Sequence, residues 1–177
     1  TIPSELAVPI EIDNGYGDME INHIAVPQFL LNNEAGYVNF TNFKADMLQI
    51  SSTSGDITIS SSSIPDISVV SSSGYISLKQ TEYLDCSLTA KSGEINIADA
   101  VSHGNLSLQT GSGDISVTYQ NEPDSLTFDV TSGSEDLSVK FSSADYQIET
   151  SAHKQGVIGN GEYRLTLNSD HGTIVIK

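Results

Sequence analysis

Apolar side chains recur along this chain in pairs, with one residue between the two members of each pair. Ile67 and Val69 form one pair, and Ile76 and Leu78 form the next, on the other side of Gly74. A spacing of two residues is the period of a β-strand, in which alternate side chains face opposite ways. The pattern therefore predicts two short strands joined by a corner at the glycine.

This two-strand pattern is repeated along the chain. The phrase Ser-Gly-x-Ile-x-(Ile/Leu/Val) stands at 54–59, 73–78, 92–97 and 112–117, and most corner glycines lie 19 or 20 residues apart. The last interval, of 39 residues, divides into 20 and 19 if His153 takes a corner position. A fixed period of this length is typical of a repeat architecture. The predicted corners are Gly17, Gly36, Gly55, Gly74, Gly93, Gly113, Gly133, His153 and Gly172.

Four rows of positions, seven and five residues before each corner and two and four residues after it, are expected to face inward. Of these 36 positions 34 are apolar, and the exceptions are Glu135 and Gln155. The two polar positions interrupt the repeat between residues 135 and 157, where we expect a protruding or binding feature. Cys86, the only cysteine, falls in an inward row and is expected to be a small buried group rather than a nucleophile.

Two architectures place short strands at this spacing. A β-sandwich has strands every ten residues or so, but nothing in it keeps a corner residue in phase over nine units. A solenoid does so, because each coil must superpose on the previous one. We predict an all-β, single-stranded parallel β-solenoid, right-handed by the crossover rule, with about nine coils of 19–20 residues. One domain would span 1–177, with an N-terminal cap at 1–9, repeats at 10–177 and an open strand edge at Ile174–Lys177.

Charge restricts the classes of partner. Seven basic residues against 23 acidic ones give a net charge of −16, so neither a nucleic acid nor a bare anionic membrane is an expected partner. No stretch approaches the ~20 apolar residues of a membrane-spanning helix. The sequence begins at Thr1, and we expect that a signal peptide or membrane anchor was removed from a precursor.

One outward column carries the candidate binding chemistry. It directly follows the corners and alternates acids with tyrosines in its first half. Such a strip could bind a glycan or a protein partner, or it could be a solvated face whose charges limit aggregation. The candidate binding residues are Asp18, Tyr37, Asp56, Tyr75, Glu94 and Asp114, after which the column is expected to continue with Ser134, Lys154 and Thr173.

Other chemistry finds little support in the sequence. His153 and His171 would lie about one coil apart near Asp170, but a metal site needs a further convergent ligand. The glycine- and aspartate-rich nonapeptide that binds calcium on some solenoids is absent. Solenoid enzymes that cleave polysaccharides use paired carboxylates or calcium with a basic residue, and Arg164 is the only arginine. We therefore expect no catalytic residues, no metal and no cofactor.

The repeated Ser-Gly-Asp/Glu-Ile-x-Ile phrase resembles bacterial β-strand-repeat domains that carry an adhesin label and are also called toastrack domains. The resemblance covers nearly the whole chain, from about Ile10 to Lys177. It implies an extracytoplasmic β-solenoid, often attached to a membrane anchor and linked to envelope stress or adhesion. It implies no catalytic residues, since the family has none established.

Three functions therefore remain open. The first is a non-enzymatic interaction module of the bacterial cell envelope, at the cell surface or secreted, with an envelope protein or glycan as partner. The second is a carbohydrate-active enzyme on a solenoid scaffold. The third is a structural spacer that stacks end to end, as a homo-oligomer, through the open edge at Ile174–Lys177.

Overall fold

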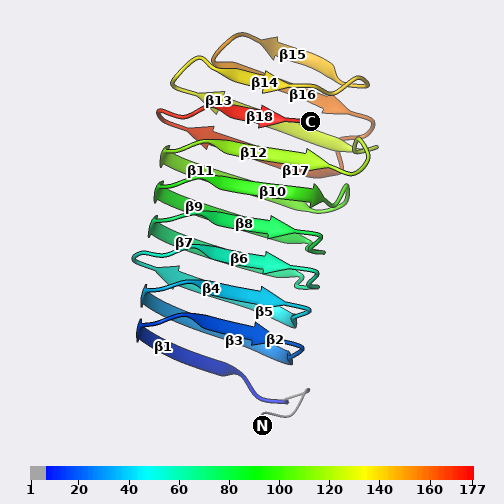
Figure 1. Cartoon of the computed structure of the whole chain (residues 1–177). Coiled ribbons are helices and arrows are strands. Elements are labelled where there is room, and N and C mark those ends of the chain that lie inside the picture. The colour runs from blue at the N-terminus through cyan, green and yellow to red at the C-terminus, as the bar shows by residue number, and fades with distance from the viewer. Residues whose placement is uncertain (1–6) are drawn as a thin grey trace.

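The computed structural model describes residues 7–177, which form eighteen β-strands and no helix. The strands make a ten-stranded and an eight-stranded sheet that face each other along the coils, and the ten-stranded sheet has two further strands at one end (Figure 1). Of the predicted N-terminal cap, residues 1–6 lie outside the described part, and Ala7, Val8 and Pro9 carry no strand. The first strand begins at Ile10, where the repeats were predicted to begin.

The first twelve strands form a six-coil stack between Ile10 and Tyr119. In each coil the odd-numbered strand belongs to the ten-stranded sheet and the even-numbered strand to the eight-stranded sheet. The coils are β1 (Ile10–Tyr16) with β2 (Met19–Asn22), β3 (Ala25–Ala35) with β4 (Val38–Thr41), β5 (Lys44–Ser52) with β6 (Ile57–Ser60), β7 (Asp66–Ser73) with β8 (Ile76–Lys79), β9 (Asp85–Ser92) with β10 (Ile95–Ala100), and β11 (Asn105–Ser112) with β12 (Ile115–Tyr119).

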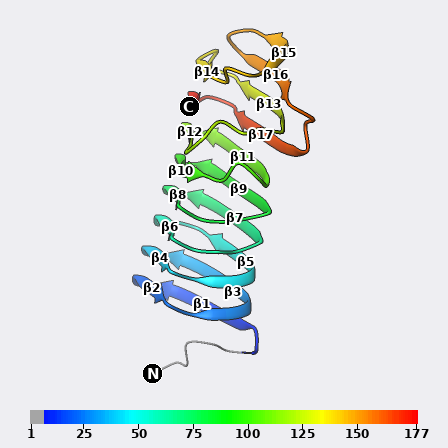
Figure 2. The same cartoon turned by 90° about the vertical axis from the view of Figure 1, so that its right-hand side faces the viewer.

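Successive coils pair in parallel and in register. Ile57 pairs with Ile76, and Ile76 pairs with Ile95, so each inward row passes from one coil to the next. Figure 1 shows the even-numbered strands on the near side, running to the right as the chain climbs, and Figure 2 places the same strands on the left after the quarter turn. A chain that climbs while its near-side strands run to the right forms a right-handed coil. The predicted parallel β-solenoid is therefore confirmed.

The core lies between the two sheets and is mainly aliphatic along the stack. The predicted inward rows are buried, as at Ile67, Val69, Ile76 and Leu78. The connection after each even-numbered strand adds inward residues that the repeat did not predict, such as Phe43, whose ring meets those of Phe29 and Phe40 with centroids 5.4 and 4.9 Å away. The same connection also contributes Ile64 and Tyr83.

The last third of the chain departs from the predicted order of coils. Its strands are β13 (Leu126–Ser132), β14 (Leu137–Val139), β15 (Asp145–Glu149), β16 (His153–Ile158), β17 (Tyr163–Ser169) and β18 (Ile174–Ile176). The coil made by β17 and β18, the inserted coil, lies between the sixth coil and the coil made by β13 and β14. Nine coils stacked in sequence order were therefore the wrong prediction: six follow in order, and two more stack in reverse order.

The predicted eighth unit is not a coil. β15 and β16 form a hairpin, and β16 pairs antiparallel with β13. His153 therefore begins a strand instead of taking a corner position, and Gln155 pairs with Asp129 instead of lying in an inward row. Strands β13–β16 form a C-terminal cap over the end of the stack (Figure 1).

The seventh unit was predicted with a register error of two residues. Leu137 pairs with Ile174, and Phe128 pairs with Leu165, so Glu135 and not Gly133 stands at the corner, with a φ of 60°. Glu135 is thus an exposed corner residue, which explains why its row turned polar. A shift of two residues keeps the same side chains on the inner face, so apolar periodicity alone does not detect it.

The open edge predicted at Ile174–Lys177 is also wrong. β18 pairs with β12 on one side and with β14 on the other. The outermost strands of the two sheets are β1 and β15, and β2 and β14. The reason for expecting a spacer that stacks through Ile174–Lys177 is therefore removed, because that strand has no free edge.

Candidate functional site

The glycine corners hold the candidate site in line. At Gly55, φ is +105°, and a Cβ atom would lie 2.1 Å from the carbonyl oxygen of Gly36. Only glycine fits where backbones stack this closely with a positive φ. The same stacking relates Gly17, Gly36, Gly55, Gly74, Gly93, Gly113 and Gly172, the last of which belongs to the inserted coil.

The predicted binding residues come together in one column, directly after these corners. Each precedes an even-numbered strand, and those strands pair in register from Met19 to Ile115. We call this set the corner column: Asp18, Tyr37, Asp56, Tyr75, Glu94 and Asp114. Beyond Asp114 the column continues with Thr173 and then Asp136, so the predicted sequence of Ser134, Lys154 and Thr173 is wrong because the coils change order there.

The aspartates of the corner column bind the backbone of the next coil. Asp18 Oδ1 accepts a hydrogen bond from the Tyr37 N–H at 3.0 Å, and Asp56 Oδ1 accepts one from the Tyr75 N–H at 2.9 Å. Asp114 Oδ1 does the same for the Thr173 N–H at 2.7 Å. One oxygen of each carboxylate thus has a structural role, which fixes the direction of the whole group.

The surface at this corner combines exposed tyrosine rings with a neighbouring row of uncharged polar side chains. The Tyr37 side chain is 61% exposed, and Tyr75, two coils further along, is partly buried. Two ladder spacings correspond to about 10 Å along the stack. Tyr16, 85% exposed, lies just before the first corner. The outward row of the even-numbered strands beside the column contains only amides and hydroxyls over five coils: Asn39, Thr58, Ser77, Asn96 and Ser116.

A second polar surface lies on the outer face of the ten-stranded sheet. It is a shallow groove of about 450 Å³ that runs across β7, β9, β11 and β17. Asn105 Nδ2 donates to Asp85 Oδ1 at 2.7 Å, and the Arg164 N–H donates to Asn105 Oδ1 at 3.0 Å. The groove is lined by the exposed residues Asp66, Asp85, Asn105 and Arg164, and by a row of hydroxyl residues beside them: Ser68, Ser87, Ser107 and Thr166.

Sequence reasoning missed this groove because it stacked the coils in order. That order separates Arg164 from Asn105 by three coils, whereas the two residues are direct neighbours in the structure. Their equal distance of eight residues from Gly172 and Gly113 was the available signal. It gives the position within a coil but not the coil that lies next to it.

The buried titratable groups are not poised for chemistry. Burial, with a smaller effect from Asp66, raises the pKa of the Cys86 thiol far above its usual value, so the group stays protonated. Burial likewise raises the pKa values of Tyr83 and Tyr119. Cys86 is buried, as predicted.

The histidines do not gather into a metal site in the described part. His153 Nε2 lies 2.9 Å from Asp129 Oδ1 on the neighbouring strand. Within residues 7–177 no three His, Cys, Asp or Glu side chains come close enough to hold a metal ion. No helix of sufficient length and hydrophobicity to cross a membrane occurs there either.

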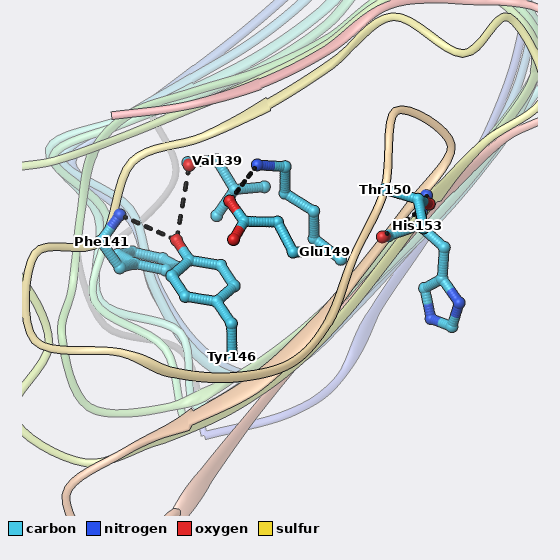
Figure 3. Close-up of polar contacts among 7 residues, drawn as sticks. Val139, Phe141, Tyr146, Glu149, Thr150 and His153 are labelled. Atoms are coloured by element: carbon cyan, nitrogen blue, oxygen red, sulfur yellow. Dashed lines mark hydrogen bonds and ion pairs between the residues drawn. The ribbon is translucent and has the colours of Figure 1, made fainter.

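Polar contacts in the C-terminal cap stabilise its own fold. Figure 3 shows Tyr146, whose hydroxyl donates to the Val139 carbonyl and accepts from the Phe141 N–H, both at 3.4 Å. Lys154 Nζ lies 5.7 Å from the centre of the Tyr146 ring and 3.1 Å from Glu149 Oε1. These contacts hold the β15–β16 hairpin against the end of the core, where the Tyr146 ring also meets Phe128.

Comparison with known proteins agrees with the fold and the repeat phrase. The whole chain, residues 1–177, matches the family model described as Toastrack DUF4097. This is a domain family of unknown function and not a known enzyme family. No curated protein and no solved structure matches the chain. The resemblance to toastrack domains is thus confirmed, and the chain belongs to the Toastrack DUF4097 family.

Proposed function

We propose that this domain is a non-catalytic binding module of the bacterial cell envelope that holds a carbohydrate chain along the corner column. The observation that supports this most is the in-register alternation of carboxylates and tyrosines over Asp18, Tyr37, Asp56 and Tyr75. Its location outside the cytoplasm is part of the proposal and follows from the resemblance to envelope-associated domains.

The chemistry of the column favours a sugar chain over an extended protein segment. Tyrosine rings offer apolar faces on which pyranose rings can stack, and fixed carboxylates accept hydrogen bonds from sugar hydroxyls. Tyr37 and Tyr75 are separated by about 10 Å along the stack, close to the length of two units in an extended β-linked chain. The amide and hydroxyl row from Asn39 to Ser116 would give further hydrogen bonds along the same direction.

Charge narrows the class of sugar. A net charge of −16, with four acids in the column itself, repels uronates and sulfated chains. We therefore propose an uncharged or amino-sugar polysaccharide. The parallel ladders and the aspartate hydrogen bonds fix the site before binding, which lowers the entropy lost on association.

The test is binding to a panel of neutral, amino-sugar and acidic polysaccharides, measured by calorimetry with the wild type and a Tyr37→Ala/Tyr75→Ala variant. We expect the variant to lose about tenfold or more in affinity, since each ring contributes on the order of 1 kcal/mol. A Val70→Ala variant, altered on the other sheet, is the matched control and should bind normally.

Two outcomes would contradict this function. Capture of envelope proteins with no binding to any polysaccharide would favour the protein partner instead. Release of reducing ends or unsaturated sugars from the panel would favour the carbohydrate-active enzyme.

A further inference from the structure

The C-terminal cap is joined to the six-coil stack through the inserted coil. On one side of that coil, Leu165 pairs with Leu106 and Ile174 pairs with Ile115. On the other side, Leu165 pairs with Phe128 and Ile174 pairs with Leu137. In residues 7–177 no strand ladder joins β11 or β12 directly to β13 or β14. Figure 2 shows the red inserted coil between the green stack and the yellow cap.

The chain passes the position of the inserted coil well before the residues of that coil occur in the sequence. β12 ends at Tyr119 and β13 begins at Leu126, so residues 120–125 carry the chain past the layer that the inserted coil occupies. The residues of the inserted coil contact partners much earlier in the sequence: Arg164 donates a hydrogen bond to Asn105, which is 59 positions before it. Contacts of such long sequence separation form late in folding, because the loop must close first. Until the inserted coil docks, the strand edges of β11 and β12 on one side, and of β13 and β14 on the other, stay unpaired, and we call the position between them the slot.

The slot is specific for a coil with the chemistry of residues 163–177. A Cβ atom at Gly172 would lie 1.9 Å from the Gly113 carbonyl oxygen, so the occupant needs glycine there. Ser169 Oγ donates to the same carbonyl at 3.0 Å, and the Thr173 N–H donates to Asp114. The inserted side chains Leu165, Leu167, Ile174 and Ile176 are at most 1% exposed. A second copy of this chain supplies all of these groups.

The connection into the inserted coil is short and glycine-rich. Ile158 and Tyr163 pair with Leu126 from opposite sides, so residues 159–162 must pass over β13 and span about 10 Å. Gly159 and Gly161 have φ values of +55° and +67°, and the Gly161 carbonyl accepts a hydrogen bond from Thr127 Oγ1 at 3.2 Å. Fully extended, a four-residue connection reaches about 17 Å, so removal of two residues would leave just enough length to span β13.

From these observations we infer that the inserted coil is exchangeable between two copies of the protein. In the exchanged dimer, β17–β18 of each chain fills the slot of the other, and residues 159–162 run between the molecules instead of over β13. Both forms make the same ladder and core contacts, so they differ mainly in the path of the connection and in the entropy of association. The dimer should therefore accumulate when the protein refolds at high concentration.

The direct test uses two full-length chains, one with Ser107→Cys and the other with Thr166→Cys. These exposed positions are paired on neighbouring strands, at a separation that a disulfide can bridge. The two chains are refolded together at high concentration, oxidised and separated without reductant. We expect a covalent heterodimer, and its absence from a dimeric fraction would overturn the inference. The matched control mixes Ser68→Cys and Ser87→Cys chains, a pair within the six-coil stack that should stay unlinked between molecules.

A second variant keeps the inference falsifiable if the disulfide geometry is poor. Deletion of Asn160 and Gly161 leaves a connection that barely spans β13, so the exchanged dimer should become the main species in size-exclusion chromatography with light scattering. A folded deletion variant that remains monomeric at high concentration would contradict the exchange. Equal cross-linking in the Ser107/Thr166 mixture and the Ser68/Ser87 control would contradict it as well.

Discussion

The six-coil stack and the C-terminal third of the chain use similar coils but assemble them differently. In the stack, each residue pairs with partners 19 or 20 positions away, as Ile76 does with Ile57 and Ile95. In the C-terminal third, Leu165 pairs with Leu106 and Phe128, which are 59 and 37 positions earlier in the sequence. The repeat therefore determines the shape of a coil, whereas the order in which coils stack depends on how each one fits its neighbours.

The corners distinguish the inserted coil from the terminal one. Gly172 fits directly on Gly113, so β17–β18 continues the stack without a gap. At the same corner, the β13–β14 coil carries Glu135, with a side chain where the others have only hydrogen. The Glu135 side chain is exposed, and β14 is the last strand of its sheet. The coil with a glycine corner thus lies within the stack, and the coil with a side chain at its corner lies at the end.

The largest expected effect comes from a corner within the stack. In Gly74→Ala, the new Cβ would lie 2.3 Å from the Gly55 carbonyl oxygen at a φ of +114°. Strain at φ and displacement of the adjacent backbone should together lower the free energy of unfolding by about 4 kcal/mol. Denaturant unfolding measures this. Gly15→Ala is the control, because its Cβ would meet nothing within 4 Å, and an equal loss in both variants would contradict the role of stacking.

Truncating the inserted coil should separate the two regions. Leu167 is 1% exposed, and Leu167→Ala should cost about 3 kcal/mol from lost burial and the cavity left behind. Hydrogen exchange should show lost protection throughout β13–β16, because the cap pairs with the stack only through this coil in the described residues. Leu48→Ala, at an equally buried site in β5, is the control and should leave the cap protected relative to the stack. A cap that keeps full protection in Leu167→Ala would contradict this connection.

A substitution at the second corner of each coil should stabilise the protein. His23, Asn42, Ser61, Gln80 and Asp99 stand 19 residues apart, all with φ near +50°, a region that costs most residues about 1 kcal/mol. Gln80→Asn should therefore raise the free energy of unfolding by about 0.5 kcal/mol, since asparagine adopts this conformation more readily. Lys79→Asn, within β8, is the control and should not stabilise. A lower thermal midpoint for Gln80→Asn would contradict the assignment.

The smallest effect concerns Glu122, in the connection between the two regions. Its carboxylate accepts hydrogen bonds from Ser142 Oγ at 2.5 Å and from Ser143 Oγ and N–H at 2.6 and 2.8 Å, which lower its pKa from 4.5 to about 2. A lowered pKa in the folded state stabilises the protein above pH 4.5, and that contribution is lost as the pH falls through 2. Glu122→Gln should thus be less stable than the wild type at neutral pH.

The difference in the free energy of unfolding between the wild type and Glu122→Gln should shrink as the pH falls from 4.5 to 2. Urea unfolding across that range measures it. Because the site is exposed, we expect only a modest change. Ser143→Ala removes one of the three hydrogen bonds, the one from Oγ, and should weaken the same pH dependence. A difference that does not vary with pH would show that the hydrogen bonds do not act on the charge.

The sequence predicts the coil but not the whole assembly. The inward rows, the glycine corners and the corner column follow from a period of two within strands and of 19 or 20 between coils. The shift from Gly133 to Glu135 could not be predicted, because two residues preserve the inner face. The neighbours of Arg164 could not be predicted either, because every coil offers similar aliphatic rows to the next. The glycine corners do not distinguish the coils either, because Gly172 fits on Gly113 in the same way as Gly113 fits on Gly93.

The position of the inserted coil next to the sixth coil is tested most directly by comparing two double-cysteine variants as dilute monomers. The account predicts rapid oxidation of a Ser107→Cys/Thr166→Cys chain, because these residues are paired on β11 and β17. A Ser107→Cys/Thr127→Cys chain should remain reduced, because β13 lies two strands from β11, beyond the reach of a disulfide. The reverse result would restore coils stacked in sequence order and contradict the structure described for the C-terminal third.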